Sequence, residues 1–200
     1  MAVDNKYYFF SPKHKSDVTS AYAPEGTKLD HELIPEIEKL DEMPFEFNLV
    51  RLKATKDGLI PNNDLSGLNK IWLDLQPNSF AWPLMSLKLQ AVVENNLTKK
   101  EGVKWLKAKI NGNGEKRDYF IPRFINKLDV LDEEKTTFVP GTDHIIKPSF
   151  NLSKIQEYVI FHQPSPFWQI TSSIYISESL KKAIQKEKLT GVSFEKASVV

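Results

Sequence analysis

One pattern occurs twice in this chain, and the repeat constrains the fold more than any other feature. The two copies span residues 83–105 and 174–194. In each copy a short apolar segment precedes a serine, and apolar residues then recur at helical spacing. An offset of 91 residues aligns the serines and the apolar positions: Ser86 with Ser177, Leu89 with Leu180, Val92 with Ala183, and Val93 with Ile184. Each copy therefore predicts a strand, a serine N-cap and a short amphipathic helix.

The exits from the two predicted helices are also alike. The second copy leaves through Leu189-Thr190-Gly191, followed by Val192 and Phe194. The first copy has Leu97-Thr98, and then Gly102-Val103 and Trp105, with three inserted residues before the glycine. We expect a turn and a second strand after each helix, and a longer turn in the first copy. The prediction assigns Ser86 and Ser177 to capping and Gly191 to the turn.

The rest of the chain favours many short strands. Asn111-Gly112-Asn113-Gly114 is a strong turn signal between expected strands over 103–110 and 119–125. Pro122 marks the second of these strands as an edge or a bulge, and Pro35 is expected to open a short helix. Because long helices do not alternate with the strands, we predict an α+β fold with a mostly antiparallel sheet and two or three short helices.

Domain organisation follows from length and linker content. The chain has 200 residues, 40% of them hydrophobic, which is enough for one sizeable core. No Gly-, Ser- or Pro-rich linker divides it. We predict one domain over residues 1–200, and the alternative is that residues 1–70 form an N-terminal appendage.

Charge and composition narrow the function classes. The chain carries 27 basic and 26 acidic residues, so a dedicated nucleic-acid binder, which needs a basic excess, is disfavoured. There is no cysteine and hence no thiolate zinc site or cysteine nucleophile. No segment has the ~20 apolar residues of a membrane helix, and the N-terminal residues lack the pattern of a signal peptide. We expect a soluble cytoplasmic protein without a membrane partner.

Catalytic signatures are weak. Asp143-His144 pairs a histidine with a carboxylate, but no metal-ligand spacing surrounds it, and no nucleophile-elbow glycine pattern is present. Gly112-Asn113-Gly114 leads into a strand, not into a helix whose N-terminus could hold phosphate. We therefore expect no cofactor, no metal and no enzyme. A small hydrolase or transferase with dispersed catalytic residues remains the alternative.

Two segments are candidates for protein contact. The densest acidic run contains Asp129, Asp132, Glu133 and Glu134, which could meet a basic partner surface or form a solvated loop. Phe167-Trp168 follows Pro164-Ser165-Pro166, and an aromatic pair on a loop is typical of an interface hot spot, with core packing as the alternative.

The closing pattern resembles a family of bacterial immunity proteins from polymorphic toxin systems. It consists of Ile176-Ser177, the helical apolar positions and the segment Leu189–Phe194. The similarity extends upstream through Ile71-Trp72-Leu73-Asp74, the first copy, Tyr119-Phe120-Ile121 and Ile160-Phe161, and so covers roughly residues 70–200. The first copy departs from the family's pattern by its insertion Lys99-Lys100-Glu101.

The resemblance implies an antidote that binds one cognate toxin and blocks it. The matched residues resemble scaffold, so the resemblance implies a function but no site, and we expect the contacts to come from variable loops. A binding module of a secretion apparatus is a second alternative. The oligomeric state is left open by the sequence.

Overall fold

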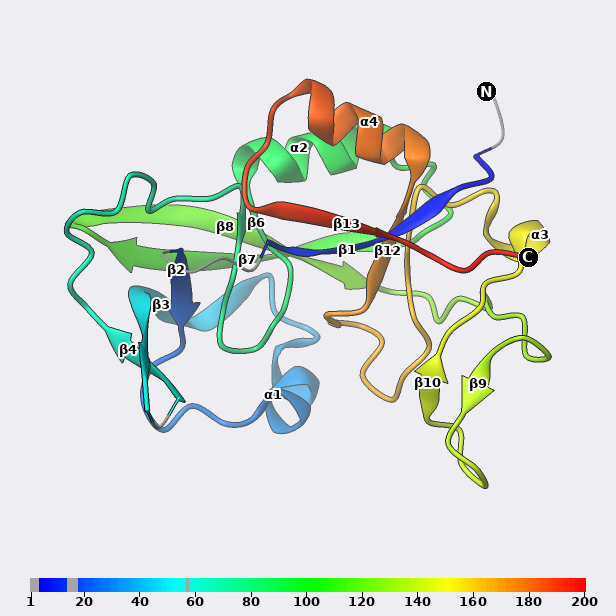
Figure 1. The fold of residues 1–200 in the computed structure, drawn as a ribbon, viewed down its shortest axis with the longest axis horizontal. Coiled ribbons are helices and arrows are strands. Elements are labelled where there is room, and N and C mark those ends of the chain that lie inside the picture. The colour runs from blue at the N-terminus through cyan, green and yellow to red at the C-terminus, as the bar shows by residue number, and fades with distance from the viewer. Residues whose placement is uncertain (1–3, 14–17, 57) are drawn as a thin grey trace.

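Two β-sheets and a pair of helices that lies over their strands form the frame of the molecule (Figure 1). The computed structural model describes residues 4–13, 18–56 and 58–200. The helices are α1 (Asp30–Ile37), α2 (Leu87–Asn96), α3 (Leu152–Ile155) and α4 (Glu178–Lys186). The strands are β1 (Tyr7–Pro12), β2 (Thr19–Tyr22), β3 (Glu42–Thr55), β4 (Gly58–Asn62), β5 (Leu75–Gln76), β6 (Leu84–Ser86), β7 (Val103–Gly112), β8 (Glu115–Phe124), β9 (Thr137–Phe138), β10 (Ile145–Lys147), β11 (Ile160–His162), β12 (Ile174–Ser177) and β13 (Val192–Lys196).

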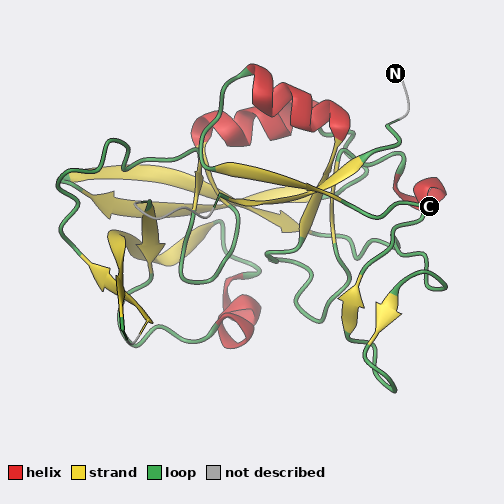
Figure 2. Cartoon of the chain, in the orientation of Figure 1, coloured by secondary structure: helices red, strands yellow, loops and turns green. Residues whose placement is uncertain are grey.

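Strand pairing confirms the predicted α+β class. The larger sheet has the order β2-β3-β7-β8-β6-β5, with β4 beside β3, and the smaller sheet has the order β11-β12-β1-β13. The pair β9 and β10 forms a separate hairpin. All pairings between these strands are antiparallel except β3 with β7. Figure 2 shows the dominance of strands over short helices.

The sequence repeat is a repeat of structure. The order β5-β6-β8-β7 in the larger sheet has the same form as β11-β12-β1-β13 in the smaller one, and all neighbours are antiparallel in both. In the first set, β8 follows β7 through a tight hairpin. In the second set its place is taken by β1 from the N-terminal end of the chain. The two copies therefore share one architecture with different connections.

Equivalent tyrosines mark this correspondence. Tyr119 lies opposite Ser86, and Tyr7 lies opposite Ser177. Both side chains are buried, and each hydroxyl donates to a backbone carbonyl: Tyr119 to Leu73 O at 2.7 Å and Tyr7 to Ile155 O at 2.9 Å. Burial raises the pKa of both phenols well above the usual value of 10.

Both predicted serine caps are confirmed. Ser86 Oγ accepts from Leu89 N at 3.2 Å, and Ser177 Oγ accepts from Leu180 N at 3.3 Å. These bonds satisfy a backbone donor that a helix start otherwise leaves unpaired. The two helices lie side by side over the strands (Figure 1). The buried residues of the two helices pack into one core cluster with residues from both sheets. The helices contribute Leu89, Val93, Leu180 and Ile184, and the strands contribute Met85 of β6 and Ile176 of β12.

The insertion in the first copy has a structural role. Glu101 is fully buried, and its carboxylate accepts from Thr98 Oγ1 at 2.9 Å and from Val159 N at 3.0 Å. Its neighbour Gly102 has a φ of +62°, a conformation that suits glycine. The longer turn thus ties the exit of α2 to the segment that enters β11.

The first 70 residues contribute to both sheets. β1 lies between β12 and β13 in the smaller sheet, and β2 to β4 extend the larger one. α1 covers the opposite face of the larger sheet from α2 and packs Leu33, Ile34 and Ile37 into a second core cluster. These pairings support the proposal that residues 1–200 fold as one domain rather than with an N-terminal appendage.

Two proline expectations differ from the structure. Pro35 lies inside α1, which begins five residues earlier at Asp30, where Glu32 Oε2 accepts from Leu29 N at 3.3 Å. Pro122 lies in β8, a strand with neighbours on both sides. It is tolerated because β6 has ended at this point: β6 pairs with Tyr119 and Phe120, and Phe124 N instead donates to Gln169 O at 2.9 Å. Pro122 therefore breaks no ladder bond to β7.

Candidate functional site

A groove of about 690 Å³ lies between the acidic run and the loop that precedes Phe167-Trp168; neither aromatic residue lines it. One wall carries Leu131 and Glu133 from the acidic run, and the facing wall is the loop Pro164-Ser165-Pro166. The β9–β10 hairpin supplies the remaining wall with Phe138, Val139 and Pro140. The groove is thus mostly apolar, and a few charged side chains stand at its margin, as is common for protein and ligand sites.

The acidic run does not present four free carboxylates. Asp129 accepts from Lys154 Nζ at 2.8 Å, and this carboxylate raises the pKa of the lysine. Asp132 Oδ1 accepts from Lys135 N at 2.9 Å and so fixes a turn. Glu133 and Glu134 are exposed, and Glu133 lies on the groove wall. Two of the four predicted residues therefore hold the segment in shape, and the other two face solvent.

The aromatic pair is divided between solvent and core. Phe167 is 38% exposed, and its ring lies 6.3 Å from the ring of His31 in α1. Trp168 is half-buried, with its ring 5.3 Å from that of His162, and packs against the shared core of the two sheets. Phe167 is therefore available for contact, and Trp168 anchors the loop to the core.

His162 is a residue that the sequence patterns did not single out. It is fully buried, and its Nε2 accepts from Leu128 N at 3.3 Å, which leaves Nδ1–H to donate to Gln163 O at 3.1 Å. Leu128 immediately follows Lys127 on one side of the groove, and Gln163 precedes the Pro164 loop on the other. His162 thus joins the two walls.

The environment of this histidine favours its neutral form. Burial lowers its pKa from the usual 6.5, against the opposing effect of the carbonyls of Gln163 and Asn126. The ring lies edge-on to Phe124 at 4.8 Å and beside Trp168. No sequence signal marked it, because its partners are backbone atoms, and those of Leu128 and Asn126 lie far from it in sequence.

The Asp143-His144 pair lies on the turn of the β9–β10 hairpin. Both side chains are exposed, and Thr142 Oγ1 accepts from His144 N at 3.2 Å. Within the described ranges, no group of three histidine, aspartate or glutamate side chains is placed to hold a metal ion. Asp143 lines the groove but His144 does not, so the groove does not hold the two as a pair, and the hydrolase alternative gains no support.

Comparison with known protein families gives a match. The family model described as immunity protein family (Imm11) matches residues 62–199, which include both copies of the repeat. No curated protein matches the chain. In the part of the chain that the structure describes, none of the helices is both long and apolar enough to cross a membrane.

Proposed function

Because the chain belongs to the immunity protein family Imm11, we propose that it binds a cognate bacterial toxin domain and neutralises it by protein–protein contact. The observation that carries this proposal is the family match over residues 62–199. An immunity role requires no chemistry of the protein itself, so we propose that it is not an enzyme. It would act in the cytoplasm, as part of a polymorphic toxin system.

The groove and its margin are the proposed contact surface. Its apolar lining suits burial of a partner side chain, and the exposed Phe167, which directly follows the groove residue Pro166, is the kind of aromatic anchor that dominates many interfaces. Glu133 and Glu134 supply exposed negative charge beside it. Asp129, Asp132 and Trp168 complete the proposed set by fixing the acidic run and the loop.

The frame around the two serine caps is not part of the proposed surface. Ser177 is buried, and both caps hold helix starts against the sheets. Substitution there would test folding and not recognition. This division agrees with partner-specific contacts that lie on loops supported by a rigid scaffold.

Co-expression tests the proposal. The toxin encoded beside this gene is produced in cells with and without the chain, and growth is measured. We expect survival only when the chain is present. Equal killing in both cultures would contradict an immunity function for this toxin. A Phe167→Ala variant that is folded but protects less would support the proposed contact surface.

A further inference from the structure

Helix α1 and its flanks carry a strong local excess of negative charge. Seven residues from Glu25 to Glu42 are carboxylates, against two lysines, Lys28 and Lys39. The net charge of +1 for the whole chain conceals this imbalance. The segment also precedes residues 62–199, the part that matches the family.

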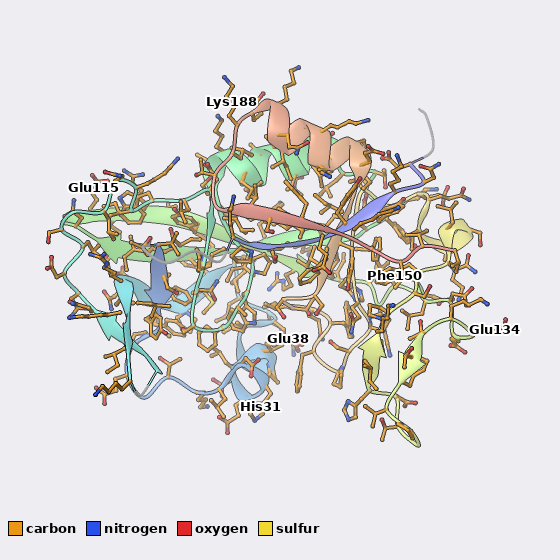
Figure 3. The ribbon with its side chains drawn as sticks, viewed as in Figure 1. His31, Glu38, Glu115, Glu134, Phe150 and Lys188 are labelled. Carbon is orange, nitrogen blue, oxygen red and sulfur yellow. The ribbon has the colours of Figure 1, made fainter. Side chains whose placement is uncertain are left out.

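Much of this negative charge faces solvent. Asp30, Glu36 and Asp41 are exposed; Glu36 pairs with Lys28, and Asp41 lies 3.9 Å from the guanidinium of Arg123. Arg123 is buried, and it donates to Leu40 O at 2.7 Å and so fixes the end of α1. Figure 3 shows His31 and Glu38 on the lower side of the molecule, well apart from Glu134.

Exposed apolar side chains surround the same helix. Leu29 is 64% exposed at its start, Leu40 is 40% exposed after its end, and Phe167 lies against His31. Shallow hollows of about 420 and 540 Å³ lie at the two ends of α1, the first lined by Leu29 and the second by Glu38 and Trp168. We call this surface the α1 face: Leu29, Asp30, His31, Glu36, Leu40, Asp41 and Phe167.

The opposite side of the molecule is basic. α4 and the turn after it carry Lys181, Lys182, Lys186 and Lys188 against Glu178 and Glu187. Figure 3 shows Lys188 at the top, on the other side of the sheets from His31. A charge separation of this kind orients a charged partner before contact and raises the association rate. A basic partner would be drawn to the α1 face and repelled from α4.

We infer that the α1 face docks a basic, partly apolar surface of the cognate toxin, an inference that rests on the proposed immunity function. Phe167 contacts His31 and directly follows Pro166, which lines the groove, so one partner would meet both surfaces across this loop. A second copy of the chain is a poorer occupant. In a two-fold dimer the same acidic face would oppose itself, and like charges in contact are unfavourable.

Charge reversal tests the inference. The probe is the purified toxin encoded beside this gene, and its association rate and Kd with the chain are measured at low and high salt. The test variant is D30K/E36K, and the matched control is E115K/D118K on the β7–β8 hairpin. Both variants change the charge by the same amount, and each removes exposed ion pairs. Thermal unfolding checks that each variant is folded.

For D30K/E36K we expect an association rate at least about tenfold lower at low salt, with a weaker dependence on salt than the wild type. The control should stay within about twofold of the wild type. Phe167→Ala should raise Kd by about 30-fold or more, the effect of losing a hot-spot aromatic.

Three results would count against the inference in different ways. If the wild type binds and D30K/E36K binds equally fast at both salt concentrations, the α1 face is not the docking surface, and the immunity proposal stands. If the wild type does not bind the toxin, both proposals fall. If the wild type alone self-associates and D30K/E36K is monomeric, the occupant is a second copy, which overturns the assignment to the toxin.

Discussion

The carboxylate of Asp74 holds Thr190, 116 residues away, through two hydrogen bonds to one oxygen. Its Oδ2 accepts from the backbone N–H and from the hydroxyl of Thr190, each at 2.8 Å, and its Oδ1 accepts from Ser86 Oγ at 2.8 Å. In the other copy, the carboxylate of Glu101 likewise accepts from the backbone N–H and from the hydroxyl of Thr98. Each Leu-Thr exit is thus fixed by a carboxylate, and Asp74 connects the cap of one copy to the exit of the other.

Replacing Asp74 with alanine should destabilise the protein by about 2–3 kcal/mol, because hydrogen bonds to a charged acceptor are lost and Thr190 N is left unpaired. Urea unfolding measures the change as a lower midpoint at an unchanged slope. Glu115→Ala, at an exposed hairpin position, is the control and should stay within about 0.5 kcal/mol of the wild type. A loss below that level for Asp74→Ala would show that the two copies do not depend on this link.

Glycine substitutions should give a graded series. Gly191 has a φ of +79°, and a Cβ there would meet Leu75 O at 2.5 Å, a backbone atom that cannot move aside. At Gly102 the nearest obstacle is the flexible side chain of Asn126, and at Gly141 nothing lies within 4 Å. We expect Gly191→Ala to cost the most, about 3 kcal/mol or more, and Gly141→Ala about 1 kcal/mol for its left-handed backbone alone.

The measurement for this series is the free energy of unfolding of the three alanine variants. Gly102→Ala should fall between the other two. Equal costs at Gly191 and Gly141 would contradict the close approach of the α4 exit to β5.

Acid should destabilise the protein through His162. Its pKa in the folded state lies below 6.5, so the unfolded state takes up the proton first as pH falls. The stability contributed by the neutral ring is therefore complete above pH 6.5 and is lost progressively below it, by at most about 1.4 kcal/mol per pH unit.

The comparison for this prediction is His162→Gln, whose side chain can still hydrogen-bond but does not titrate. Unfolding free energies of both proteins are measured between pH 7.5 and 5. The variant should show a smaller drop than the wild type, although it starts from a lower stability at pH 7.5. Parallel curves would contradict the assignment of the acid sensitivity to His162.

Alkali should act through the buried phenols. Burial raises the pKa of Tyr175 to about 12, above its unfolded value near 10, and Tyr7 and Tyr119 shift in the same direction. The unfolded state then loses protons first, so stability is complete below pH 10 and declines as pH rises through 10 to 12. Tyr175→Phe should flatten this decline. An unchanged slope in that variant would assign the alkaline sensitivity to other groups.

Local patterns predicted the repeat well. The two caps, the turn at Gly191 and the β7–β8 hairpin follow from short-range rules about serine, glycine and apolar spacing, and the structure confirms them. The capped helix of each copy and the strands beside it depend on residues within about 25 positions of one another. This is why a single sequence was enough to locate them.

Long-range partners could not be predicted in the same way. Nothing local in Tyr7–Phe10 shows that β1 fills, between β12 and β13, the place that β8 fills in the other sheet. His162 joins the groove walls through backbone atoms, which leave no trace in a residue pattern. The acidic segment around α1 was missed for a different reason: its seven carboxylates are spread over the 18 residues from Glu25 to Glu42, while the run at Asp129–Glu134 is compact.

Titration of the purified toxin encoded beside this gene tests the central claim most directly. Residual toxin activity is measured as the chain is added in increasing molar ratio. A stoichiometric antidote predicts a linear fall that ends near one equivalent. Activity that is unchanged at a large excess would contradict binding, and complete loss at a small fraction of an equivalent would contradict a non-enzymatic antidote.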